Sequence, residues 1–195
     1  ADEGPALRSA VRAARRAASA DRSPLVVAHE LGRRPLELPL VDPESGAARP
    51  TPVTLADSRL LATVEQRARP HGYLVLRGGE AVAGLLTLLQ VRTVRLAGPA
   101  RLAVEAYDVE RLGRPSRRAG ESINPDRSLA VTLRAATIDA PAGALYVPMG
   151  QPACGVVAAA LEPDSPGSYL GTGIIAMNED EIEAPLYRVM DDTIR

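Results

Sequence analysis

The sequence has no lysine, phenylalanine or tryptophan, and only one cysteine among its 195 residues. The single Cys154 excludes an internal disulfide and leaves the compartment open between cytoplasm and periplasm. Because large rings are scarce, the core has to be built from Val, Leu, Ile and Ala, whose packing depends on many small contacts. All 23 basic residues are arginines, whose rigid fork of donors suits pairing with carboxylates.

Charge and hydropathy exclude two kinds of partner. The net charge of −1 gives no basic excess of the kind that nucleic-acid binding requires. No apolar run approaches the roughly 20 residues of a membrane span, and no charged-then-apolar leader opens the chain. We therefore expect no nucleic-acid partner and no membrane span. The 46% of hydrophobic residues suffice for one domain, or for one domain plus a fragment of another.

A catalytic metal site is not expected either. Zinc needs three or four converging His, Cys, Asp or Glu ligands. The chain offers only His29, His71 and Cys154 beside its carboxylates, and neither histidine opens a His-x-x-Glu pair. We therefore expect no metal, no cofactor and no catalytic residue in this chain.

The residue pattern predicts an α+β fold, in which an N-terminal helix precedes a small strand–helix–strand unit and an antiparallel sheet. Residues 2–20 have helical periodicity, but their apolar stripe is thin, so this helix alone would be marginal and needs a larger surface to pack on. Six prolines in residues 21–57 forbid a helix and favour edge strands and extended connections. Asp42-Pro-Glu-Ser-Gly46 is typical of a loop tip.

Residues 58–98 predict the strand–helix–strand unit. A short helix is expected over 60–67, and strands over 73–76 and 93–96 flank a helix over 80–91. This order favours a parallel pair of strands joined by a right-handed crossover.

The rest of the chain predicts an antiparallel β region with long hairpin connections, because apolar and polar residues alternate. The expected elements are strands over 102–106, 129–135, 145–147 and 186–189, a turn at 141–143, a helix over 153–161, and a polar hairpin arm or loop over 111–124.

Two side chains invite a nucleophile interpretation. Cys154 stands at the start of an expected helix, whose dipole could activate a thiol. A small buried hydrophobe is favoured instead, because no histidine is near in sequence. Ser168 lies in Gly167-Ser-Tyr-Leu-Gly171, which is not the Gly-x-Ser-x-Gly elbow, so a serine hydrolase is disfavoured.

Two glycine-containing segments are only weak candidates for phosphate-binding loops. Gly78-Gly79 joins an expected strand to a helix, yet it lacks the spacing of a dinucleotide or P-loop motif. Gly171-Thr-Gly173 is also interpreted as a turn rather than a ligand loop.

Charged clusters have simple explanations as well. A loop with Arg114, Arg117, Arg118 and Glu121 could dock an acidic partner, although a solvated loop is favoured. The acidic run from Glu179 to Glu183 is expected to be solvent-exposed.

Two further polar clusters are Asp57-Ser58-Arg59 and Glu162-Pro-Asp164. Capping and turn formation account for both without invoking function.

The most specific stretch is Pro141-Ala-Gly-Ala-Leu-Tyr-Val-Pro-Met-Gly-Gln-Pro152, followed by Ala160-Leu-Glu-Pro-Asp-Ser165 and Ser168-Tyr169. It resembles the C-terminal region of bacterial M14 zinc carboxypeptidase-like proteins. Further similar segments are Thr54-Leu-Ala-Asp-Ser-Arg59, Arg69-Pro-His-Gly-Tyr-Leu74, Ala103-Val-Glu-Ala-Tyr107 and the helix at Leu7–Ala18. The resemblance covers most of residues 5–190.

The resemblance implies a helix over residues 1–20 like the last helix of a peptidase domain, and a C-terminal accessory α/β domain over 21–195. The parent protein would bind one zinc ion and remove a C-terminal residue from a peptide, or an amino acid from a peptidoglycan-type stem. No position here matches its zinc triad or its catalytic glutamate. The chain would be a non-catalytic portion that packs on the peptidase domain and shapes its substrate cleft. A free-standing interaction module that pairs with a separate catalytic chain is the alternative, and an independent hydrolase ranks last.

Overall fold

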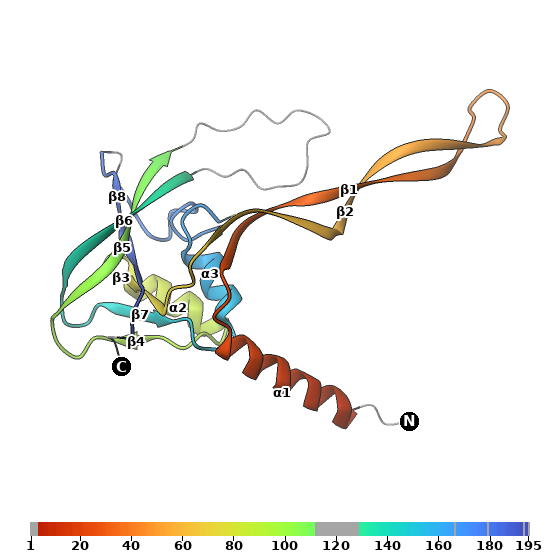
Figure 1. Cartoon of the computed structure of the whole chain (residues 1–195). Coiled ribbons are helices and arrows are strands. Elements are labelled where there is room, and N and C mark those ends of the chain that lie inside the picture. Colours follow the sequence, from red (N-terminus) through yellow and green to blue (C-terminus); the bar gives the residue numbers. More distant parts are fainter. Residues whose placement is uncertain (1–3, 112–128, 166, 179, 193, 195) are drawn as a thin grey trace. The chain divides into compact units, whose positions relative to one another are not determined.

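The structure, a computed structural model, describes residues 4–111, 129–165, 167–178, 180–192 and 194 (Figure 1). The chain divides into two compact units, one made of Ala1–Val27 with Arg67–Arg195 and the other of Ala28–Gln66. The elements are α1 (Gly4–Ala20), β1 (Leu25–Val41), β2 (Ala48–Arg67), β3 (Gly72–Val75), α2 (Gly79–Leu88), β4 (Val94–Arg95), β5 (Ala100–Arg111), β6 (Leu129–Ala140), β7 (Leu145–Pro148), α3 (Cys154–Leu161) and β8 (Glu183–Val189). The expected α+β class, with an N-terminal helix first, is confirmed.

The first unit contains a six-stranded sheet in the order β4-β7-β3-β8-β5-β6, in which every neighbouring pair is antiparallel. Helix α2 connects β3 to β4 with β7 between them, and α3 connects β7 to β8 with β3 between them. These are two interleaved split βαβ units, the connection order of ferredoxin-like folds, with the β5–β6 hairpin added beyond β8. The parallel pair predicted over 73–76 and 93–96 is therefore wrong in its pairing, since β7 inserts between two strands that run in the same direction.

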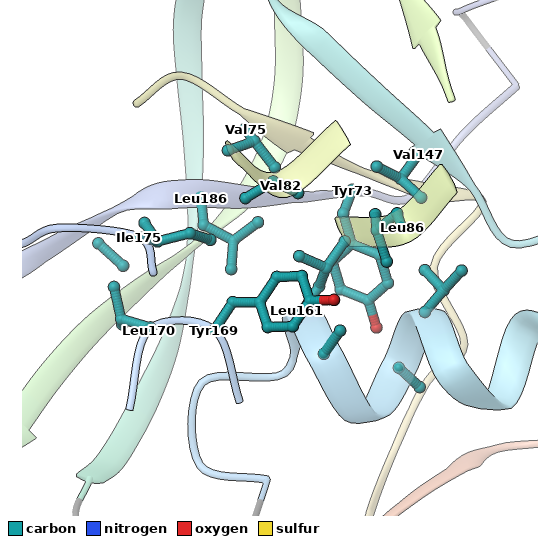
Figure 2. Packing of buried hydrophobic residues seen from close by; sticks show 14 of the residues in the cluster. Tyr73, Val75, Val82, Leu86, Val147, Leu161, Tyr169, Leu170, Ile175 and Leu186 are labelled. Atoms are coloured by element: carbon teal, nitrogen blue, oxygen red, sulfur yellow. The ribbon is translucent and has the colours of Figure 1, made fainter. Parts of the chain in front are cut away.

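The main core lies between one face of this sheet and the two helices. Alternation in β3 points Tyr73 and Val75 toward the helices, where they meet Val82 and Leu86 of α2 and Leu161 of α3 (Figure 2). A second apolar cluster on the opposite face includes these residues: Leu74, Leu102, Val104, Ala106, Tyr146, Tyr187 and Val189. The core is mostly aliphatic, as the composition predicts, but two tyrosines at its centre are fully buried, Tyr73 and Tyr107.

Helix α2 ends at Leu88, three residues before the predicted end at Val91. Gln90 takes a left-handed conformation with φ of 58°. The Val91 N–H then donates to the Leu86 carbonyl at 2.9 Å and the Gln90 N–H donates to the Thr87 carbonyl at 3.0 Å. This is a Schellman ending, which satisfies carbonyl groups of the last turn and brings Val91 back onto buried Leu86.

The second unit, Ala28–Gln66, is a two-stranded ribbon formed by most of β1 and β2. The extended conformation expected for the proline-rich segment is confirmed, whereas the helix predicted over 60–67 is wrong, because pairing with β1 continues the strand. At Gly32 the strands approach closely, since a Cβ there would lie 2.6 Å from the Cβ of Leu60. The expected loop tip is present: Asp42 Oδ1 accepts the N–H groups of Glu44 and Ser45 at 2.9 and 3.0 Å.

Gly72 gives a direct test of the sheet packing. A Cβ at this position would lie 2.4 Å from ring atoms of Tyr146, so we expect Gly72→Ala to lower the free energy of unfolding. Overpacking of this kind costs about 1–3 kcal/mol, which urea denaturation would measure. A Cβ at Gly98 meets nothing within 4 Å, so Gly98→Ala serves as the matched control. Equal effects of the two substitutions would contradict this packing.

Candidate functional site

The strand register brings three polar side chains together on the helix-facing side of the sheet. Arg188 of β8 pairs directly with Tyr73 of β3 on one side and with Glu105 of β5 on the other. Alternation in β8 puts Arg188 on the same face as Ala184 and Leu186, so its side chain enters the core and is 0% exposed. A fully buried guanidinium requires carboxylate partners nearby.

Those partners follow α3. Glu162 and Asp164 are 1% and 3% exposed, and both accept hydrogen bonds from Arg67 at the end of β2. Arg67 Nη1 donates to Glu162 Oε2 at 2.8 Å and to Asp164 Oδ1 at 3.0 Å, while Nη2 donates to Asp164 Oδ2 at 2.6 Å. One arginine thus holds two carboxylates that are separated by a single proline.

The other oxygen of Glu162 connects this group to the sheet. Glu162 Oε1 accepts the Tyr73 hydroxyl at 2.6 Å and lies 3.3 Å from Arg188 Nε. Arg188 also donates to Glu105 and to the backbone carbonyl of Ala68. We call Arg67, Tyr73, Glu162, Asp164 and Arg188 the buried charge network.

The surroundings shift the pKa of Tyr73 and of Arg67 in this network. Burial and then the Glu162 charge raise the pKa of Tyr73 well above 10, so its hydroxyl stays protonated and donates. Burial opposes the charged form of Arg67, but Asp164 and Glu162 raise its pKa overall. Burial and then Glu162 also raise the pKa of Tyr107, whose hydroxyl has no hydrogen-bond partner among the described residues.

The contacts of the network hold the turn after α3 to Arg67 and to the centre of the sheet. Its carboxylates are closed off from solvent and neutralised by guanidinium groups, so neither is available to a substrate. The interpretation of Glu162-Pro-Asp164 as caps and turn residues is incomplete: a turn is present, but both side chains bind Arg67. Arg188 was also missed by the sequence analysis. Its position two residues after Leu186 and four after Ala184 could have indicated that it points to the buried face of β8.

Ser168 and Cys154 have structural surroundings. The Ser168 hydroxyl donates to the Pro163 carbonyl at 2.6 Å and accepts the Gly171 N–H at 3.0 Å, which fixes the turn after the network. Cys154 is buried in the main core, with its sulfur 3.5 Å from the Ala18 carbonyl, in agreement with the interpretation as a small hydrophobe.

The glycine segments are turns, as expected. Gly78 has φ of 74° and precedes α2, and Gly173 has φ of 80° in a turn. His29 and His71 are both exposed. Within the described ranges, no three His, Cys, Asp or Glu side chains gather as a metal ion would require.

The remaining charged clusters differ from the expectations in part. Arg114, Arg117, Arg118 and Glu121 lie outside the described residues, as does Glu179. Glu181 accepts two hydrogen bonds from Arg77 at 2.7 and 2.8 Å, and this pairing lowers the pKa of Glu181 to about 2. Glu183 binds Arg134 and accepts the Tyr187 hydroxyl at 2.6 Å. These two acids of the predicted exposed run are therefore paired.

Asp57 is the one buried acid of the ribbon among the described residues. It accepts Arg34 Nε at 2.9 Å and Arg59 Nη2 at 2.8 Å, and Arg59 above all holds the pKa of this carboxyl well below its usual range. It pairs with Arg34 across the ribbon and with Arg59 on its own strand, rather than acting as a simple cap.

Comparison with models of protein families, with curated proteins and with solved structures finds no match to this chain. Among the described helices, none combines the length and the apolar character that crossing a bilayer requires.

The tyrosines provide a test of the buried site by pH. The pKa is raised for all five phenols, by burial first in each case. A raised folded-state pKa contributes stability below the unfolded value of about 10, and this contribution is lost as the pH rises further. We therefore expect no free phenol ionisation near pH 10, and absorbance at 295 nm that rises only as circular dichroism reports unfolding.

The urea-unfolded chain is the reference, and its tyrosines should titrate near pH 10. A fraction of tyrosines that titrates at that pH while the fold is intact would contradict the described burial.

Proposed function

We propose that this chain is a non-catalytic portion of an M14-like zinc metallocarboxypeptidase, which packs on the peptidase domain and shapes its substrate cleft. The observation that carries the proposal is that α1, a helix of 17 residues, buries none of them. In this account zinc is held by the peptidase domain, and the present chain supplies no ligand and no catalytic group. The resemblance of the segments around Pro141–Pro152 and Ala160–Ser165 supplies the identity of the partner.

Helix α1 has the features of a helix that is completed by another surface. Its largest apolar side chains, Leu7 and Val11, are 66% and 45% exposed. Arg8, Arg12 and Arg16 are spaced four residues apart, so their charges repel along one stripe, and no acid lies in the first turn. Carboxylates on a partner surface would neutralise these arginines, and a shallow apolar strip on the same surface would cover Leu7 and Val11.

The ribbon of the second unit supports the same proposal. A two-stranded sheet alone is marginally stable in water, because it has no second layer to bury its side chains against. Several large apolar residues of the ribbon are exposed: Leu38, Leu40, Val41, Leu55, Leu60, Leu61 and Val64. Apolar surface gathered on one element in this way is typical of a protein–protein interface.

A free-standing module that pairs with a separately encoded catalytic chain would use the same surfaces. The two forms differ only in whether a peptidase domain with a His-x-x-Glu motif precedes this chain in the same polypeptide, which the upstream reading frame decides.

The proposal is tested by purifying this chain with the M14-type peptidase domain encoded in the same reading frame or nearby. We expect a one-to-one complex by light scattering. Val11→Asp in α1 and Leu61→Asp in the ribbon should each weaken it about tenfold or more, because each would bury an unpaired charge.

Leu88→Asp is the matched control, since Leu88 is 79% exposed on α2, outside the proposed surfaces. Absence of a complex, or equal weakening by Leu88→Asp, would contradict the proposal.

A further inference from the structure

Two segments that stand out in the sequence meet at one cleft of the first unit. Arg69, Pro70 and His71 form one side of it, and Pro148, Met149 and Gly150 form another. The cleft has a volume of about 340 Å³, near the lower end for small-molecule sites. Neither segment belongs to the buried charge network or to the exposed surfaces of α1 and the ribbon. The features described so far therefore assign no role to them.

The backbone around the cleft is held in place. The His71 N–H donates to the Val189 carbonyl, and the His71 carbonyl accepts the Met149 N–H, both at 2.8 Å. These two bonds tie one side of the cleft to β8 and to the end of β7. A wall fixed in this way loses little conformational entropy when a ligand binds.

Gln151 fixes a further wall. Its side chain is 4% exposed, and its Oε1 accepts the Arg92 N–H at 2.7 Å. Its Nε2 donates to the carbonyls of Arg92 and Pro148 at 3.1 and 2.6 Å. The side-chain amide of Gln151 thus binds both the N–H and the carbonyl group of Arg92 and holds this residue at the cleft.

The charges of the cleft favour an anion. Three arginines line it, Arg22, Arg69 and Arg92, against one lining carboxylate, Asp192. Arg69 is engaged by Asp21 at 2.7 Å and by the Ser23 carbonyl at 3.0 Å. Within the described residues, by contrast, the exposed guanidinium of Arg92 makes no hydrogen bond or ion pair.

An apolar side accompanies these charges. Tyr146 lines the cleft together with Met149 and Ile194. Burial above all raises the pKa of Tyr146 to about 12, with Asp192 adding to the rise and Arg92 opposing it, so the phenol remains a neutral donor at ordinary pH. A ligand with an oxyanion at one end and a hydrocarbon or ring at the other end matches this lining.

We propose that this cleft binds a small organic anion, whose carboxylate or phosphate is held by the free guanidinium of Arg92 and whose apolar part lies against Tyr146 and Met149. Arg92 supplies parallel N–H donors for two oxygens, and Gln151 is the positioning residue that sets Arg92 in place. None of the residues that line this site belongs to α1 or to the ribbon.

The test uses three probes that share a ring and differ in charge: benzoate, phenyl phosphate and the neutral benzamide. We expect saturable shifts of the amide signals of His71, Arg92 and Val94 with at least one of the two anions, at millimolar concentrations and low salt. Benzamide should bind at least tenfold more weakly than that anion. The tighter of the two anions identifies the carboxylate or the phosphate as the preferred group.

Variants assign the binding to the cleft. Arg92→Gln should weaken anion binding about tenfold or more, because a neutral amide lacks the charge-assisted pair of hydrogen bonds. Arg101→Gln is the matched control, because Arg101 is exposed on β5 and does not line the cleft. The affinity of the Arg101→Gln variant for the anion should stay within about twofold of that of the unaltered protein.

Three results would overturn the proposal: no saturable binding of either anion, equal binding of benzamide, or equal effects of Arg92→Gln and Arg101→Gln. The comparison of benzoate with benzamide uses the unaltered chain, so it does not depend on the folding of any variant. Partner binding through α1 and the ribbon is measured separately, so either proposal can fail alone.

Discussion

The arrangement of the first unit depends on Arg67 and the two carboxylates that it holds, Glu162 and Asp164. Removing one member would leave an uncompensated charge in the interior, which costs about 3–5 kcal/mol. Because Arg67 ends β2 and the acids follow α3, their pairing holds Arg67 against the turn after the helix. Glu162 also contacts Tyr73 and Arg188, so it connects the turn after α3 to the centre of the sheet. The Glu162-Pro-Asp164 segment, which stands out in the sequence, is therefore explained first by its role in folding.

Local patterns were sufficient for most elements of the fold. Alternation predicted β5 and β6, helical periodicity predicted α1, and turn residues predicted the tip at Asp42–Gly46. The helix expected over 60–67 failed because its residues suit either state, and pairing with β1 decides between them. The insertion of β7 between β3 and β4 could not be predicted locally, since it depends on which edges remain free when the chain returns.

The buried charge network was even less accessible from the sequence. Arg67 and Asp164 are 97 residues apart, and Tyr73 and Glu162 are 89 residues apart. Only the strand register places Arg188 beside Tyr73 and Glu105. By contrast, the thin apolar stripe of α1 already indicated a helix that needs another surface, and none of its 17 residues is buried.

The most direct measurement is a double-mutant cycle on Arg67→Met and Asp164→Leu, followed by urea denaturation. If the buried charges act as one unit, the double variant should be more stable than the sum of the single effects predicts. We expect a coupling of about 2 kcal/mol, as found for residues that share a buried network. Effects that add within about 0.5 kcal/mol would show that the pair contributes independently, and would contradict the central place given to Arg67.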